Sequence, residues 1–125
     1  MLAGMSEAEL RDRAMRAVAA AAGEVAGDPT RPTFHFLPPA QWMNDTHGAF
    51  YLNGHYHVFY QFQPWHDMSG PDQTAEGIGW GHARSPDLVR WEFLPPALLP
   101  LADQGERGLA SGSACIRVDG VPMLF

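Results

Sequence analysis

Apolar and polar residues alternate in short runs over most of the chain after Gly48, and this pattern predicts antiparallel strands. The expected strands are AFYL (49–52), HYHVFYQFQ (55–63), IGWGHARS (78–85) and RWEFL (90–94). Asn-Gly after the first run is a strong two-residue hairpin signal, and Ser-Pro-Asp-Leu after the third predicts a turn. A polar loop, 64–77, separates the second and third runs. Four consecutive strands with such connections predict one antiparallel meander.

A second series of strands follows a proline-rich crossing at 94–108. It consists of SGSACIRV (111–118), an Asp-Gly turn and VPMLF (121–125). A four-stranded meander followed by the start of another is typical of a propeller blade and its successor, with a β-sandwich as the alternative on topology alone. Because propellers close with roughly four to eight blades, about one and a half blades are expected here, as part of a longer domain.

The N-terminal region has a different pattern, which predicts a helix over 6–22. Ser6 and Glu9 form a capping box, apolar residues recur at helical spacing, and Gly23 is the expected stop. GDPTRP (27–32) reads as a stiff linker. We therefore divide the chain into a helix with its linker, 1–30, and a β domain, 31–125. The expected fold class is all-β with an N-terminal α-helical extension.

Composition narrows the possible functions. With 46% apolar and 18% charged residues, the 125-residue chain is expected to be globular. The net charge of −6 argues against a nucleic-acid partner. The single cysteine, Cys115, excludes an internal disulfide. No apolar run approaches the ~18 residues of a membrane span, and the N-terminus lacks a signal-peptide pattern. A cytoplasmic location is therefore expected, with no membrane partner.

The stretch PPAQWMNDTHG, 38–48, is unusual for a loop because it sets Trp42 and Met43 beside polar residues. Asp45 within it is either a turn-forming carboxylate or a carboxylate held in a site. Asn44, Gln61 and Ser111 are further polar residues close to aromatic ones. Buried polar groups need partners, and a sugar, with many hydroxyls and an apolar face, would use both kinds of side chain.

A metal site is the alternative to a sugar-binding site. His55 and His57 alternate along one predicted strand and so share a face. A zinc site needs three or four ligands, and the spacing of His82 and Cys115 gives no support to a third. Histidines that pack within the sheet are the preferred interpretation, and neither a metal nor a cofactor is expected.

Several motifs, kept in order, resemble one family closely. They are RPTFHFLPPAQWMNDTHGAFYLNGHYHVFYQFQP, GWGHARSPDLVRWEFLPPALLP and SGSACI, which together run from about residue 31 to the end. The chain thereby resembles the N-terminal part of glycoside hydrolase family 32, the β-fructofuranosidases, which include invertases, inulinases, levanases and sucrose-6-phosphate hydrolases. This resemblance implies a five-bladed β-propeller with the site in its central funnel.

The resemblance also implies residue roles. Asp45 would be the nucleophile of a retaining mechanism, ionised and hydrogen-bonded by neighbours such as Asn44. Asn44 and Gln61 would bind hydroxyls of the fructosyl unit, Trp42 would wall the pocket, and Ser111 would line the funnel. Each has a structural alternative: Asn44 as a turn former, Gln61 as a satisfied strand end, and Ser111 as a small residue before a glycine.

Some positions depart from the family pattern. Where the family has Pro-Asn after the nucleophile, this chain has Thr46 and His47. Without the proline we expect a looser turn, and His47 would either donate to a substrate hydroxyl or serve as a turn residue. Ala75 and Ala110 replace expected aromatic residues, so the rim of the sugar pocket should be reshaped. Trp65 could supply a substitute aromatic surface.

Two further carboxyl groups are implied by the family but missing from this sequence. They are a transition-state-stabilising Asp in an Arg-Asp-Pro motif and an acid/base Glu in a Glu-Cys motif. None of the glutamates at 76, 92 and 106 has a matching context. The expected function is therefore hydrolysis of β-fructofuranosides, either sucrose, sucrose phosphate or fructans, that requires further blades. Alone, the chain should be inactive. The alternative is a noncatalytic remnant or a carbohydrate-binding relic.

Overall fold

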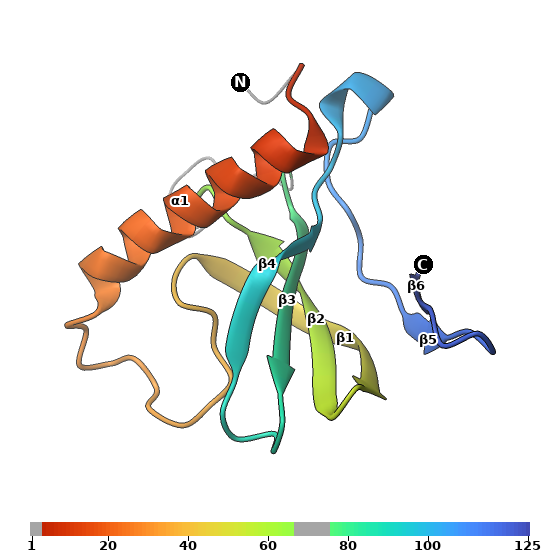
Figure 1. The fold of residues 1–125 in the computed structure, drawn as a ribbon. Helices are drawn as coiled ribbons and strands as arrows, with labels where there is room; N and C mark the ends of the chain where they lie inside the picture. Colours follow the sequence, from red (N-terminus) through yellow and green to blue (C-terminus); the bar gives the residue numbers. More distant parts are fainter. Residues whose placement is uncertain (1–3, 67–75) are drawn as a thin grey trace.

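The computed structural model describes residues 4–66 and 76–125 (Figure 1). The elements of these residues, in chain order, are α1 (Glu7–Val25), β1 (Trp42–Leu52), β2 (His55–Gln63), β3 (Gly79–Ser85), β4 (Glu92–Leu98), a 3₁₀ turn (Ala102–Gln104), β5 (Ala114–Ile116) and β6 (Pro122–Leu124). Most of the predicted loop 64–77, with Ala75, lies outside the described residues.

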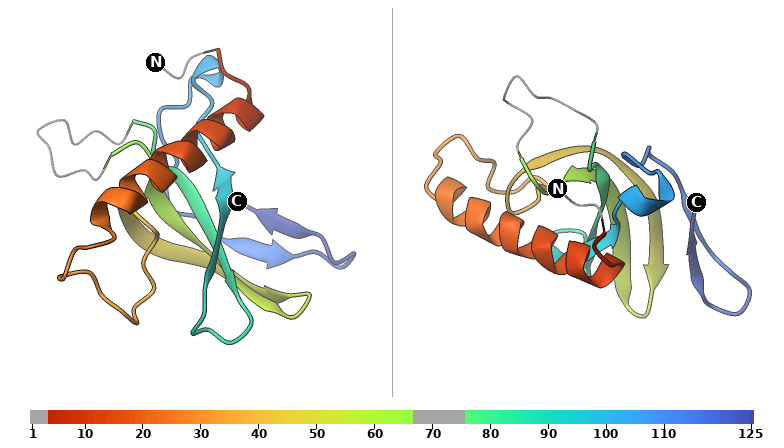
Figure 2. Two further views of the ribbon diagram at one scale, coloured as in Figure 1. Left: turned by 60° about the vertical axis from the view of Figure 1, so that its left-hand side comes forward. Right: turned by 90° about the horizontal axis from the view of Figure 1, so that it is seen from above.

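The first four strands form one antiparallel sheet in the order β1-β2-β3-β4, so the predicted meander is confirmed. Asn53 and Gly54 both have positive φ, 50° and 81°, as a tight hairpin turn with the favoured twist requires. β5 and β6 pair as a separate antiparallel hairpin, which lies beside β1, on the other side of the sheet from α1 (Figure 2).

β1 is longer than predicted, because residues 42–48 belong to the strand and not to a loop. The pairing with β2 shifts twice, between Met43 and Thr46 and between His47 and Phe50. At each shift two residues of β1 oppose one residue of β2, which is the definition of a β-bulge. Periodicity alone could not reveal this strand because each bulge shifts the alternation of sides by one residue.

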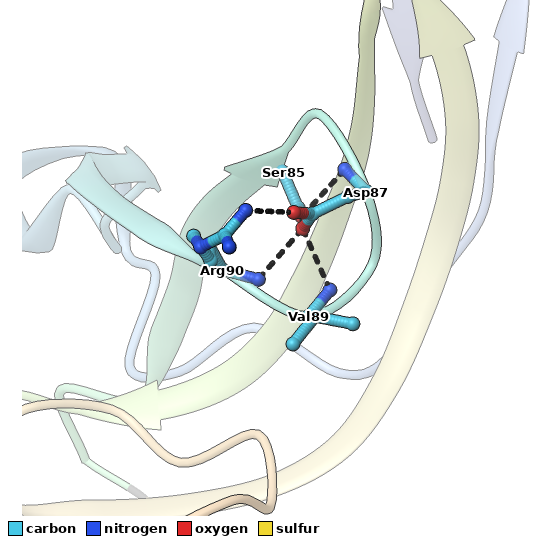
Figure 3. A network of polar contacts seen from close by, with 4 residues as sticks. All are labelled: Ser85, Asp87, Val89 and Arg90. Atoms are coloured by element: carbon cyan, nitrogen blue, oxygen red, sulfur yellow. Dashed lines mark hydrogen bonds and ion pairs between the residues drawn. The ribbon is translucent and has the colours of Figure 1, made fainter.

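The turn between β3 and β4 is organised around Asp87 (Figure 3). Its carboxylate accepts the backbone N–H of Val89 at 2.9 Å and that of Arg90 at 2.8 Å, and it pairs with the Arg90 guanidinium at 2.8 Å. Its own N–H donates to the Ser85 hydroxyl. These bonds, the Arg90 N–H first, lower the pKa of Asp87. The predicted Ser-Pro-Asp-Leu turn is confirmed.

β4 continues through Pro95 and Pro96, where a connection had been predicted. Prolines are tolerated on an edge strand, where an outward N–H would be unpaired. Arg11 of α1 donates to the carbonyl oxygens of Pro96 and Ala97, at 3.0 and 2.8 Å. The helix thus covers part of a sheet edge that would otherwise be open to pairing with another chain.

α1 begins where predicted, with the capping box of Ser6 and Glu9 present. It continues past Gly23 to Val25, because glycine inside a helix costs only about 0.5–1 kcal/mol relative to alanine. Of its buried residues, Val18 packs on the sheet, whereas Leu10 and Ala14 pack against Leu99, just past the end of β4. In the part of the chain that the structure describes, no helix is long and apolar enough to cross a bilayer.

The two faces of the sheet differ in composition. The helix face packs Val18 of α1 against a set of strand residues, Met43, Val58, Tyr60, Phe62, Ala83 and Phe93. Cross-strand partners share a face, so the register assigns the opposite one, here named the hairpin face, to Trp42, His47, Phe59, Gln61, Trp80 and His82. The candidate site residues of the sheet therefore belong to the hairpin face.

Candidate functional site

Asp45 lies in the first bulge of β1. Asn44 and Asp45 together oppose a single residue of β2, Gln61, because Met43 pairs with Phe62 and Thr46 with Tyr60. Bulges re-aim side chains and are over-represented beside active sites. The extra residue brings three of the predicted site residues to one level of the sheet.

The side chain of Asp45 is held by a residue of the segment that precedes β5. The Ser111 hydroxyl donates to Oδ2 of Asp45 at 2.9 Å, across 66 residues of sequence. Within residues 4–66 and 76–125 no hydrogen bond reaches the other carboxylate oxygen, and both residues are exposed. The sequence had suggested Asn44 as the donor, whereas the structure has Ser111 in this role, and Asn44 stays exposed beside it.

Trp80 holds the segment that carries Ser111. Its indole Nε1 donates to the Ala110 carbonyl at 2.8 Å. A Cβ at Gly112 would lie 2.6 Å from the Trp80 ring and 2.4 Å from the Phe125 carbonyl oxygen, so only glycine fits there. On the other side of Gly112, Ser113 and Phe125 exchange two backbone hydrogen bonds, at 2.7 and 3.0 Å. Ser111 is thus fixed by its neighbours in sequence.

His47 ties the backbone of the bulge. Its Nδ1 lies 3.0 Å from the carbonyl oxygen of Asp45, and since a carbonyl can only accept, Nδ1 is the donor. Nε2 is buried without a hydrogen-bond partner among the described residues. The ring packs edge-on against Trp80 with centroids 4.2 Å apart. His47 lies in strand β1, so the expectation that it is a turn residue is wrong. Donation to a substrate hydroxyl stays a prediction.

The other predicted residues are placed as follows. Gln61 is half-buried and borders a cavity of about 600 Å³, together with Glu76, Arg107 and Ala110. Its described lining includes Ala110, where the family pattern has an aromatic residue, but not Asp45. Trp42 is half-buried at the start of β1, opposite Gln63. The structure groups Asn44, Asp45, Gln61 and Ser111, with Trp42 at one end.

Trp65 is half-buried and packs beside the core cluster of Leu10 and Leu99. The Arg13 guanidinium lies over its ring, 5.5 Å from the centroid. The suggestion that Trp65 substitutes as an aromatic wall of a sugar pocket receives no support from these contacts.

Two of the histidines considered as metal ligands, His57 and His82, contact each other. His57 Nδ1 and His82 Nε2 lie 3.0 Å apart, and the rings stack on Phe50 and Phe59 respectively. Burial lowers the pKa of His82 to about 4, with His57 and Arg84 adding repulsion, and burial also lowers the pKa of His57. Among the described residues no cluster of three or more His, Cys, Asp or Glu side chains could hold a metal ion.

Two contacts around Asp45 were not predicted from the sequence. The Ser111–Asp45 bond joins β1 to the segment before β5, and no local pattern encodes that approach. The Trp80–His47 contact had a partial signal, since the hairpin register places both residues on one face of the sheet. Prediction of this contact would also have required knowledge of the first bulge of β1, which sets the register of His47.

Comparison with known proteins gives the family. The family model described as the glycosyl hydrolases family 32 N-terminal domain matches residues 35–125. A fructan 6-exohydrolase of Triticum aestivum is 46% identical over 95 residues, which are 76% of this chain and 15% of that protein. A levanase of Bacillus subtilis is 48% identical over 87 residues, 69% of this chain and 11% of the levanase.

Solved structures agree on the fold. A family 32 β-fructofuranosidase of Bombyx mori superposes with a TM-score of 0.73 at 33% identity, over 91% of this chain and 22% of that one. The chain thus spans between 11% and 22% of the length of these relatives. The predicted fold class is confirmed: the four-stranded sheet and the β5–β6 hairpin belong to a propeller domain. Residues 35–125 place this chain in glycoside hydrolase family 32.

Proposed function

We propose that this chain supplies the nucleophile, Asp45, for the hydrolysis of β-fructofuranosides by a retaining double displacement. The observation that carries the proposal is an exposed carboxylate that a bulge turns toward the hairpin and that Ser111 anchors through one oxygen only. The oxygen Oδ1 is left to form a bond. A carboxylate that served only to close a turn would not need a donor from 66 residues away.

In the first step Oδ1 of Asp45 attacks the anomeric carbon, a C–O bond to the enzyme forms, and the glycosidic C–O bond breaks. A carboxylic acid protonates the leaving oxygen, and a water molecule then hydrolyses the fructosyl-enzyme with that same group acting as base. The Ser111 hydroxyl holds Oδ2 throughout, so the attacking oxygen needs no reorganisation before it reacts.

The acid/base carboxyl must lie about 5–5.5 Å from the nucleophile in a retaining enzyme. In the proposal this group and a stabilising carboxyl come from further blades, because no glutamate of this chain has a matching sequence context. The short span of the chain relative to its relatives supports this arrangement. General acid catalysis is typically worth 10²–10⁴-fold, so without these blades turnover would be very slow.

The relatives support the proposed substrate class. They include a fructan 6-exohydrolase, a β-fructofuranosidase of Oryza sativa and a sucrose-6-phosphate hydrolase of Escherichia coli. Structures of two relatives contain 1-kestose or sucrose. In our proposal Asn44, in the bulge, and Gln61, opposite it on β2, bind hydroxyls of the fructosyl unit, and Trp42 forms one wall.

The test is made in the complete protein that the gene encodes, with sucrose, sucrose 6-phosphate, inulin and levan as substrates. Asp45→Ala should lower kcat by several orders of magnitude, and an external small anion such as azide should restore turnover by entering the vacated space. NMR of the first product should show the β-anomer for the unmodified enzyme. Near-normal activity of Asp45→Ala, or an inverted product, would overturn the proposal.

A noncatalytic role predicts a different outcome. If the gene product has no Arg-Asp-Pro and Glu-Cys motifs after residue 125, no fructoside should be hydrolysed by the unmodified protein. Fructose binding, followed by titration calorimetry, would then separate a carbohydrate-binding relic from a remnant without function.

A further inference from the structure

We propose that His47 is a positioning residue, which together with Trp80 holds the bulge of Asp45 in the orientation that its chemistry needs. The inference rests on the proposed function of Asp45. It goes further because it assigns a role to a residue at which this chain departs from the family pattern.

The geometry of His47 restricts it to one tautomer. Because Nδ1 donates to the Asp45 carbonyl at 3.0 Å, the proton of a neutral ring sits on Nδ1 and the lone pair on Nε2. That lone pair is buried and has no partner among the described residues. Leaving a buried polar atom without a partner costs free energy, so a role that requires the ring in this place would account for its retention.

The surroundings show what the ring holds. His47 lies between the two bulges of β1, where the pairing with β2 is interrupted on both sides. Gly48, next to it, has a φ of 60° and lies in the second bulge. A segment with two nearby bulges has fewer ladder bonds to define its shape, and the His47–Asp45 bond supplies one across the first bulge.

Trp80 joins the two contacts that orient Asp45. Its ring meets the His47 ring at a centroid distance of 4.2 Å, and its Nε1 donates to Ala110, the residue before Ser111. His47 fixes the backbone of Asp45, and Ser111 fixes its side chain. Trp80 is only 3% exposed and belongs to β3, one of the two inner strands of the sheet. The same buried side chain therefore supports both contacts.

Substitutions can separate the two features of His47. Asparagine carries an N–H₂ at the position of Nδ1 but has no ring, and so keeps only the donor. Phenylalanine keeps the ring and loses the donor, and alanine removes both. His55 offers a matched control, because its Nδ1 makes the same contact with the carbonyl two residues earlier, that of Asn53, at 3.2 Å, but at the far end of β2.

The experiment measures kcat and KM on sucrose and levan for the complete protein carrying His47→Ala, His47→Phe, His47→Asn and the control His55→Phe. We expect kcat to fall about 10-fold or more in His47→Ala, since small misplacements of a reacting group can cost up to 10²-fold. KM should change by less than about 2-fold, because the lost effect belongs to the transition state. His47→Asn should recover more of kcat than His47→Phe, and His55→Phe should match the unmodified enzyme.

A second readout guards against a general loss of structure. The ¹⁵N spectrum of the His47 ring in the unmodified protein should show Nδ1 protonated and Nε2 not. The positioning role would be overturned by a normal kcat in His47→Ala, by a change in KM alone, or by the opposite tautomer. If instead Asp45→Ala remains active, the proposed function fails. The two failures are therefore distinguishable.

Discussion

The two faces of the four-stranded sheet differ in the kind of contact that their side chains make. On the helix face, apolar side chains of the strands pack on Val18 of α1. On the hairpin face, Trp80, His47 and Ser111 each make one directed contact that ends on Asp45 or on the segment beside it. Burial on the helix face stabilises the fold, and burial tolerates changes of side-chain shape. The contacts on the hairpin face orient Asp45, and an orientation does not tolerate such changes.

Burial separates the helix face from Asp45 and Ser111, although it does not separate the two faces as wholes. Tyr60 and Phe62 of the helix face are 2% and 4% exposed, and burial raises the pKa of Tyr60. Phe59 and Trp80 of the hairpin face are also buried, at 3% each, whereas Asp45 and Ser111 are exposed. Changes among the buried residues should therefore act on the free energy of unfolding, and changes at the contacts of Asp45 on activity. The following predictions test that separation, beginning with the largest effect.

The strongest test of the helix face is Phe62→Ala. Removing a buried phenylalanine costs about 3–5 kcal/mol of unfolding free energy, from lost burial and the cavity left behind. Urea denaturation of the complete protein measures this. The activity per folded molecule at low temperature should stay close to that of the unmodified protein. A large fall in kcat without loss of stability would contradict the separation of the two faces.

The imidazole pair of the hairpin face predicts a pH dependence of stability. His82 takes up a proton near pH 4 when folded but near 6.5 when unfolded, so the unfolded chain binds more protons between these values. Stability should be fully present above pH 6.5 and should decrease as the pH falls toward 4. His57 and Arg84, which face His82, act in the same direction.

Melting temperatures between pH 7 and 4 would show this dependence. His82→Gln should flatten the profile, because it removes the group that must charge. His55→Gln, at the half-buried start of β2, should leave it largely unchanged. Identical slopes for His82→Gln and the unmodified protein would refute the assignment.

Gly112→Ala tests the fit of the Ser111 segment on Trp80. The new methyl group would lie 2.4 Å from the Phe125 carbonyl oxygen and 2.6 Å from the indole, and overpacking of this kind costs about 1–3 kcal/mol. The displaced segment should weaken the Ser111–Asp45 bond, so kcat should fall more than stability suggests. Gly27→Ala is the control, since nothing lies within 4 Å of a Cβ there. Equal effects of both variants would argue against the proposed support.

The smallest effect is expected at Gly23, inside α1. A Cβ at this exposed position meets nothing within 4 Å. Gly23→Ala should therefore stabilise the protein by about 0.5–1 kcal/mol, because alanine has less backbone freedom to lose on folding. Thermal unfolding measures the gain, and kcat should not change. A loss of stability would mean that Gly23 has a role in the end of the helix that its contacts do not reveal.

The sequence by itself determined the local elements. The capping box, the Asn-Gly hairpin and the alternation in β2 are short-range patterns, because caps, turns and side alternation depend on residues a few positions apart. The motifs that follow one another in order also led to the prediction of a site around Asp45, which stays a prediction. The boundary that failed at Gly23 reflects the small cost of glycine inside a helix, whereas those at β1 and Pro95 depend on pairing with neighbouring strands and on contacts with α1.

Only the tertiary structure decided how Asp45 is held. Asp45 lies in the first bulge of β1, and its carboxylate accepts from Ser111, 66 residues away in the sequence, rather than from Asn44. A side chain's partners in a site depend on distances between segments that are remote in the chain, and these follow from the register, the bulges and the packing of the whole sheet. The residue types of the site can therefore be read from the sequence, but their hydrogen bonds cannot.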